Sequence, residues 1–232
     1  MRLSQGDFGR ETVYGNDPVQ RALAFESGGA QWLHVVDLDA ARTGKAGNRA
    51  VVADIAAAVK IPVQAGGGVR GEADAEQLLA AGVARVIVGT AALCQPGFLA
   101  GLAGRWPGRV AAGVDHFNGE VRVKGWAEGS GHNVATAVAE LTDAGAVAVV
   151  VTEISRDGLM VGPDVAGYRA LLEVCPVPLV ASGGVGSLEH LRRLAWLQVS
   201  GRQLAGVIVG RAIYEGRFSV PDAVAATRGM PS

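Results

Sequence analysis

Two glycine-rich segments of this sequence have the form of phosphate-binding turns. Residues 64–70 read QAGGGVR, and residues 180–185 read VASGGV. Each is followed by an apolar run that ends in glycine, VIVGTA at 86–91 and VIVGRA at 207–212. A glycine pair after a strand leaves backbone N–H groups free to approach an anion, and a helix N-terminus adds a favourable dipole. Because the two sets lie half a chain apart, they predict a two-phosphate ligand held across a barrel with internal twofold pseudosymmetry.

The residues expected to bind this ligand lie in the glycine turns and at the strand ends that follow them. They are Gly67, Gly68, Arg70, Gly89, Thr90, Ser182, Gly183, Gly184, Gly210 and Arg211.

Acid–base chemistry is expected at the ends of two other strand-like runs. Asp115 ends the run at 111–115, and a carboxylate at the C-terminal end of a barrel strand lies on the face where active sites are built. We therefore expect it to act as a general acid or base. Thr152 would donate a hydrogen bond to substrate or to a carboxylate. Asp157 precedes Gly158, so it has either a direct catalytic role or a turn-forming one.

A loop tryptophan and a pair of aspartates complete the expected pocket. Trp126 follows a glycine, so it could close over a planar ring by stacking, or it could pack on the barrel rim. Asp37 and Asp39 end a strand-like run, and we expect one to line the pocket and the other to bind backbone. His116 is expected to be a bystander, and His34 to belong to the core or to support the site.

Composition limits the possible partners. The 232 residues are 49% hydrophobic and carry a net charge of −1, which gives no basic field for nucleic acid or an anionic membrane. The two cysteines are isolated, which indicates a reduced, cytoplasmic protein. The sequence has neither an apolar run long enough for a membrane span nor a signal-peptide pattern. No cluster of His, Cys and Asp has metal-ligand spacing, so we expect no metal.

Short β-branched runs alternate with Ala- and Leu-rich helical stretches, which is typical of a parallel α/β sheet. Strands are expected at 32–38, 63–65, 85–88, 110–114, 147–152, 179–181 and 206–209. Helices are expected at 17–27, 48–59, 72–80, 96–104, 133–143, 165–174, 188–197 and 212–226. The fold predicted is a TIM (β/α)8 barrel forming one domain over 1–232, with pseudo-symmetric halves at about 1–108 and 109–232.

An eightfold barrel needs one strand more, and it would come first in the chain. The repeat pairs Thr152 with Asp37 and puts the counterpart of Asp115 at or before Met1. Most of the first strand is therefore expected to lie outside the printed sequence. A start codon assigned too late would account for this, and so would a true truncation; we favour the former.

With these motifs in place, the chain resembles the ProFAR isomerases of histidine biosynthesis, including the actinobacterial form that also isomerises phosphoribosylanthranilate in tryptophan biosynthesis. The likeness runs nearly end to end. It includes WLHVVDLDAA at 32–41, GGGVR at 66–70, VGTAAL at 88–93, Gly125-Trp126, the 152–158 segment, SGGV at 182–185 and VGRAIY at 209–214.

The resemblance implies an Amadori rearrangement of a bis-phosphorylated aminoaldose to an aminoketose, performed by a monomer without a cofactor. Two carboxylates would share the proton transfers, and Asp115 matches one of them. Arg2 matches a pocket arginine, Trp126 a mobile stacking tryptophan, and Asp157 a carboxylate of the actinobacterial branch. Lys124 stands where the bifunctional members often have arginine. A lysine ammonium group cannot bind a carboxylate through two parallel hydrogen bonds as a planar guanidinium can. Leu159 stands where the family usually has Thr.

Two other functions remain open at this stage. The cyclase subunit of imidazole glycerol phosphate synthase has the same two-phosphate barrel, but it usually carries Asn-Thr-Ala where this chain has Gly-Thr-Ala at 89–91, and it lacks the Gly-Trp motif. An inactive phosphosugar-binding remnant would also account for the missing strand.

Overall fold

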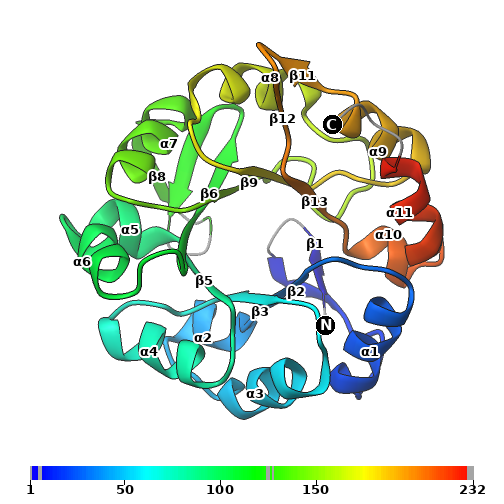
Figure 1. Cartoon of the computed structure of the whole chain (residues 1–232), viewed down its shortest axis with the longest axis horizontal. Helices are drawn as coiled ribbons and strands as arrows, with labels where there is room; N and C mark the ends of the chain where they lie inside the picture. Colours follow the sequence, from blue (N-terminus) through cyan, green and yellow to red (C-terminus); the bar gives the residue numbers. More distant parts are fainter. Residues whose placement is uncertain (1, 5–6, 124–125, 127, 229–232) are drawn as a thin grey trace.

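The computed structural model of this chain is a ring of parallel strands surrounded by helices (Figure 1). It describes residues 2–4, 7–123, 126 and 128–228, and side chains from residue 12 onward. Seven parallel strands follow one another in the order β13-β10-β9-β6-β5-β4-β3. They are β3 (Leu33–Val36), β4 (Val63–Gly66), β5 (Arg85–Val88), β6 (Val110–Phe117), β9 (Val149–Glu153), β10 (Leu179–Ser182) and β13 (Gly206–Ile208). This is the TIM (β/α)8 architecture that the sequence predicted.

Helices connect the strands on the outside of the ring (Figure 1). They are α1 (Pro18–Ser27), α2 (Leu38–Thr43), α3 (Arg49–Ala58), α4 (Glu72–Ala80), α5 (Thr90–Cys94), α6 (Phe98–Arg105), α7 (Val134–Asp143), α8 (Val165–Val174), α9 (Leu188–Ala195), α10 (Arg211–Tyr214) and α11 (Val220–Thr227). Side-chain caps explain several of the starting points. Asp17, Asn133, Asp164 and Ser187 each accept a backbone N–H from the first turn that they precede.

Two of the predicted elements are wrong in extent. The first expected strand, at 32–38, ends at Val36, because Asp37 accepts the N–H of Ala40 and so begins α2. The expected helix over 212–226 is two helices. Gly216 has φ +68, and Ser219 forms a capping box with Asp222, so the chain stops one helix and starts another.

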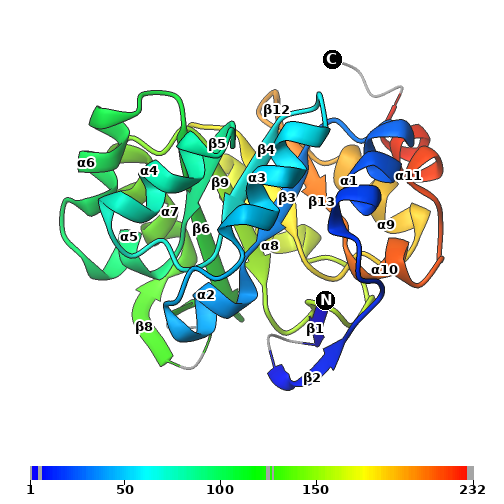
Figure 2. The same cartoon turned by 90° about the horizontal axis from the view of Figure 1, so that it is seen from below.

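Three hairpins were not predicted. They are β1 (Arg2–Ser4) with β2 (Asp7–Thr12), β7 (Glu120–Val123) with β8 (Glu128–Asn133), and β11 (Gln198–Val199) with β12 (Arg202–Gln203). Figure 2 shows the β1–β2 hairpin, β8 and α2 at one end of the barrel. That end carries the C-terminal ends of the parallel strands, since α2 directly follows β3. Short polar strands lack the alternation that identifies longer ones.

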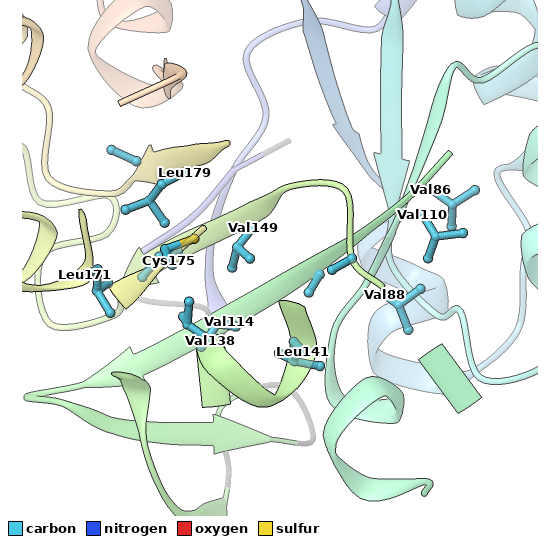
Figure 3. Packing of buried hydrophobic residues seen from close by; sticks show 14 of the residues in the cluster. Val86, Val88, Val110, Val114, Val138, Leu141, Val149, Leu171, Cys175 and Leu179 are labelled. Atoms are coloured by element: carbon cyan, nitrogen blue, oxygen red, sulfur yellow. The ribbon is translucent and has the colours of Figure 1, made fainter. Parts of the chain in front are cut away.

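The hydrophobic core has two layers, because successive strand residues face opposite ways. The larger layer lies between strands and helices, and Figure 3 shows part of it, with Val86, Val114, Val149 and Leu179 from four strands and Leu171 from α8. The smaller layer lies inside the barrel. It contains Ile87, Ala111, Ala148, Val150 and Val180, with Ile208 packed against it. Inward-facing residues toward the C-terminal ends of the strands therefore line the mouth of the barrel.

The ring is not continuous in the part of the chain that the structure describes. There, β3 and β13 are the ends of the parallel sheet, and no described strand pairs with both. Apolar side chains beside this gap are less buried than elsewhere: Val36 is 41% exposed, and all of β13 is partly exposed.

Candidate active site

Asp115 lies at the mouth of the barrel, where the sequence placed it. It follows Ala111 and Gly113 on the inward-facing side of β6, and in the parallel register it lies opposite Thr152 of β9. Asp115 as a whole residue is partly exposed, while Thr152 is 8% exposed. The Thr152 side chain hydrogen bonds to Asp115. The two residues therefore form one unit that faces the open end of the barrel.

The electrostatic surroundings of Asp115 favour its protonated form. Burial of the carboxyl group raises its pKa above the ordinary value, and the negative charge of Asp157 adds to this. Hydrogen bonds from Trp126 and Thr152 lower the pKa, as does the neighbouring His116, but desolvation dominates. A carboxyl group with a raised pKa can retain a proton closer to neutral pH, which general acid catalysis requires.

Trp126 contacts the carboxylate directly. Its indole Nε1–H donates to Asp115 Oδ2 over 2.7 Å. The residue is partly exposed and has φ +74, a left-handed conformation that is uncommon for a bulky side chain. The sequence predicted that this indole would stack on a ring or pack on the rim. In the structure the indole hydrogen bonds to the Asp115 carboxylate, and its stacking on a ligand ring stays a prediction.

The second glycine turn forms a pocket beside this unit. Its lining includes Asp157, Ser182, Gly183, Gly184, Gly210 and Arg211, together with Gly158, Met160, Val185 and Ile208. The enclosed part of the hollow measures about 20 Å³, which is room for about one water-sized group. Six of the residues expected at the site from the second half of the sequence thus lie around one cavity.

The two glycine turns repeat each other in backbone conformation. Gly67 and Gly183 have φ +94 and +93, and Gly68 and Gly184 have φ +72 and +80. In each turn the second glycine packs so closely on the preceding βα loop that a Cβ would overlap its main chain. Glycine is needed here for the turn itself and for this close approach.

The next pair of glycines is also equivalent. Gly89 has φ −94 and ψ −116 before α5, and Gly210 has φ −116 and ψ −92 before α10. Thr90 and Arg211 are the first residues of these short helices. The duplication seen in the sequence is thus a duplication of backbone geometry.

The register corrects one detail of the predicted repeat. Val36 pairs with Gly66 and Thr152 pairs with Ser182, so the counterpart of Thr152 is Val36, not Asp37. Asp37 corresponds to Glu153. Both side chains point away from the inside of the barrel toward the surrounding helices, and each is 3% exposed.

Two arginines expected at the phosphates have their guanidinium groups bound to protein. Arg70 donates to the carbonyl of Ala41 at the end of α2. Arg211 donates to Glu215 Oε1 at 2.5 Å and to the carbonyl of Gly158 at 2.6 Å. Each side chain thus ties a glycine-rich segment to a neighbouring loop or helix.

The aspartates after β3 are largely engaged within the protein. Asp37 is 3% exposed, caps α2, and also accepts from Asn48. Asp39 accepts from the same amide and lies near Arg42. Asp37 is thus the aspartate that binds backbone. His34 hydrogen bonds to Gln64 inside the barrel, as a supporting residue would.

Three predicted features lie outside the described parts: the side chain of Arg2, Lys124, and Gly125 of the Gly-Trp motif. Sequence reasoning missed Tyr168, whose hydroxyl accepts the N–H of Ser182 and has the carbonyls of Ser182 (2.8 Å) and Val151 (3.1 Å) as acceptors for its one proton. This residue joins β9 and β10 directly below the second turn. On a helix its position indicated only a core aromatic, so no sequence pattern marked it.

Comparison with known proteins places the chain in a family. A family model described as "Histidine biosynthesis protein" matches residues 1–219. The chain belongs to this family. Family members similar to it include a protein of Paracoccus denitrificans, 44% identical over 97% of this chain and 93% of the relative. A protein of Desulfovibrio desulfuricans is 44% identical over 96% of this chain and 89% of the relative. A Synechococcus protein is 46% identical over 96% and 86%.

These histidine biosynthesis proteins share one name, 1-(5-phosphoribosyl)-5-((5-phosphoribosylamino)methylideneamino) imidazole-4-carboxamide isomerase. That name denotes the ProFAR isomerase that the motifs indicated. The comparisons give no support to the tryptophan-pathway reaction, to the cyclase or to an inactive remnant. None of the described helices has the length and apolarity to cross a membrane.

Proposed function

We propose that this protein is a ProFAR isomerase, which converts a bis-phosphorylated aminoaldose to the aminoketose by an Amadori rearrangement. The observation that carries the proposal is the position of Asp115. In the sheet order β10-β9-β6-β5-β4, the strand of Asp115 lies midway between the strands that lead into the two glycine turns. A ligand with a phosphate at each end would have its middle at this carboxyl group.

The reaction begins with opening of the ribosylamine ring, and Asp115 is suited to protonate the ring oxygen. Its raised pKa favours the protonated form, and its partial exposure lets it reach a bound ligand. Thr152 holds the carboxyl group from the neighbouring strand. A proton then leaves C2 of the opened imine to give the enolamine, and protonation at C1 with loss of the C2 hydroxyl proton yields the aminoketose. Asp157 lines the adjacent pocket and acts electrostatically on Asp115, so we assign it a share in this second transfer.

The glycine turns would bind the two phosphates through backbone N–H groups, and the helix dipoles of the following segments would add to the attraction. Since the arginines of these segments are held by protein groups, main-chain donors carry most of this recognition. We further propose that the enzyme acts as a cytoplasmic monomer on this small-molecule substrate.

The test is a turnover assay with purified ProFAR, following the change in absorbance as the aminoaldose is consumed. We expect wild-type protein to turn over and Asp115→Asn to lose about 10²–10⁴-fold in kcat. Asp143→Asn, an exposed change at the end of α7, is the matched control and should keep the wild-type rate. An Asp115→Asn variant with wild-type turnover would show that another group performs the proton transfer.

A further inference from the structure

A second cluster of ionisable groups lies behind Asp115, on the outer side of the same strands. His116 of β6 and Glu153 of β9 are neighbours in register, and each is 3% exposed. Asp164, which caps α8, completes the cluster. One nitrogen or oxygen atom from each of the three lies within 4.8 Å of the other two. The proposed isomerisation uses none of these side chains.

The Nδ1 atom of His116 has two neighbours, one of which is a hydrogen-bond donor and the other an acceptor. The Gly119 N–H points at Nδ1 over 3.2 Å, which requires a lone pair there. Glu153 Oε2 lies 3.1 Å from the same Nδ1. A nitrogen that accepts from Gly119 cannot also donate to the carboxylate. Two acceptor atoms therefore face each other unless a proton or a cation lies between them.

The charge balance favours a cation with two charges. Glu153 Oε1 accepts the N–H of Ser155, and Asp164 Oδ1 accepts that of Gly167, contacts that suit carboxylates. Among the residues that the structure describes, no Lys or Arg forms an ion pair with either carboxylate. His116 and Glu153 are buried and Asp164 is partly exposed, so two carboxylates facing one imidazole leave at least one negative charge uncompensated.

We propose that His116, Glu153 and Asp164 bind a divalent metal ion of the zinc class. One imidazole nitrogen and two carboxylate oxygens are a donor set that suits Zn²⁺ and its transition-metal neighbours, whereas Mg²⁺ and Ca²⁺ prefer oxygen alone. The Nδ1–Oε2 separation of 3.1 Å also suits two ligands bonded to one ion at about 2.0–2.1 Å. Binding at Nδ1 would replace the contact with Gly119.

The ion would join three elements that are far apart in the sequence. It would tie the end of β6 to the end of β9 and to the N-terminus of α8, directly behind the pair formed by Asp115 and Thr152. The spacing along the chain matches no metal motif, so no sequence pattern indicated a metal site. Only the parallel register brings His116 beside Glu153.

The test is stoichiometric binding of Zn²⁺ to the whole protein after removal of metal with a chelator, measured by competition with a chromophoric chelator. We expect one equivalent to bind wild-type protein, and His116→Asn and Glu153→Gln to weaken binding by roughly a hundredfold or more. The matched control is His132→Asn, because His132 Nε2 lies 3.9 Å from Glu140 Oε2 in an exposed pair. It should bind as wild type does. Wild-type protein that binds less than one equivalent, or binding unaffected by His116→Asn, would overturn the proposal.

A second measurement needs no variant and does not depend on isomerase activity. In ¹⁵N-detected NMR of the imidazole groups, Zn²⁺ should shift the ring nitrogens of His116 and leave those of His34, His132 and His190 unchanged. Shifts at the other histidines without one at His116 would refute the site, even if zinc binds somewhere.

Discussion

The hydrogen bond between Trp126 and Asp115 makes a testable prediction about catalysis. Trp126→Phe removes the Nε1–H donor that lies 2.7 Å from Asp115 Oδ2 and keeps an aromatic ring. A hydrogen bond to a charged group contributes about 1.5–3 kcal/mol, and one pKa unit corresponds to about 1.36 kcal/mol. Since Asp115 is partly exposed, solvent would replace part of the lost bond. We therefore expect the pKa of Asp115 to rise by about one unit.

The direction follows from the sign of the interaction. The indole N–H stabilises the ionised carboxylate, so its loss favours the protonated form and raises the pKa further. If protonated Asp115 is the general acid, the alkaline limb of the kcat/KM profile should move to higher pH by about one unit. The ratio kcat/KM reports the pKa values of the free enzyme, which is the state in which this hydrogen bond is seen.

The assay is a pH profile of kcat/KM for wild type and Trp126→Phe, with a carboxyl ¹³C NMR titration of Asp115 as an independent readout. Trp196→Phe is the control, because Trp196 is 61% exposed and lies on the outer surface at the end of α9. Any loss of ring stacking would change the height of the profile but not the position of its limb. An Asp115 titration that is the same in wild type and Trp126→Phe would refute the reasoning.

Three further changes follow from the structure. Asp115→Asn should keep or raise Tm at pH 7. The raised pKa of Asp115 means that its ionised carboxylate lowers the stability of the fold at pH values above the unfolded-state pKa of about 4. The gain in Tm should vanish near pH 3, and a lower Tm at pH 7 would contradict this. Gly184→Ala should destabilise the protein by more than the roughly 1–2 kcal/mol expected from the positive φ of this residue, since its Cβ would meet main-chain atoms. Gly108→Ala is the control, because Gly108 has φ +78 and open space around it, and it should show only the backbone cost. Urea denaturation measures both variants. Tyr168→Phe should lower the free energy of unfolding by about 1–3 kcal/mol, because main-chain groups of β9 and β10 lose their hydrogen-bond partner. Tyr214→Phe, at a partly exposed ring, is the control and should be nearly neutral in urea denaturation.

The sequence by itself determined the barrel and the position of Asp115, its proposed acid–base group. Apolar runs without alternation identify strands buried on both faces, and all seven parallel strands were predicted near their observed positions. Asp115 was recognisable because a carboxylate that ends a buried parallel strand must lie at the C-terminal face of a barrel. The glycine turns were recognisable because few other residues tolerate the backbone they require, and that backbone recurs in both halves.

Only the tertiary structure decided which side chains meet. Nothing in the sequence near Trp126 shows that its indole bonds Asp115, and nothing near Arg70 or Arg211 shows that their guanidinium groups are held by protein carbonyls. The pairing of His116 with Glu153 depends on strand register, and a shift of one residue would turn each side chain to the other face. Local sequence fixes backbone preference and burial, whereas contacts between distant strands and loops arise only when the sheet closes around its core.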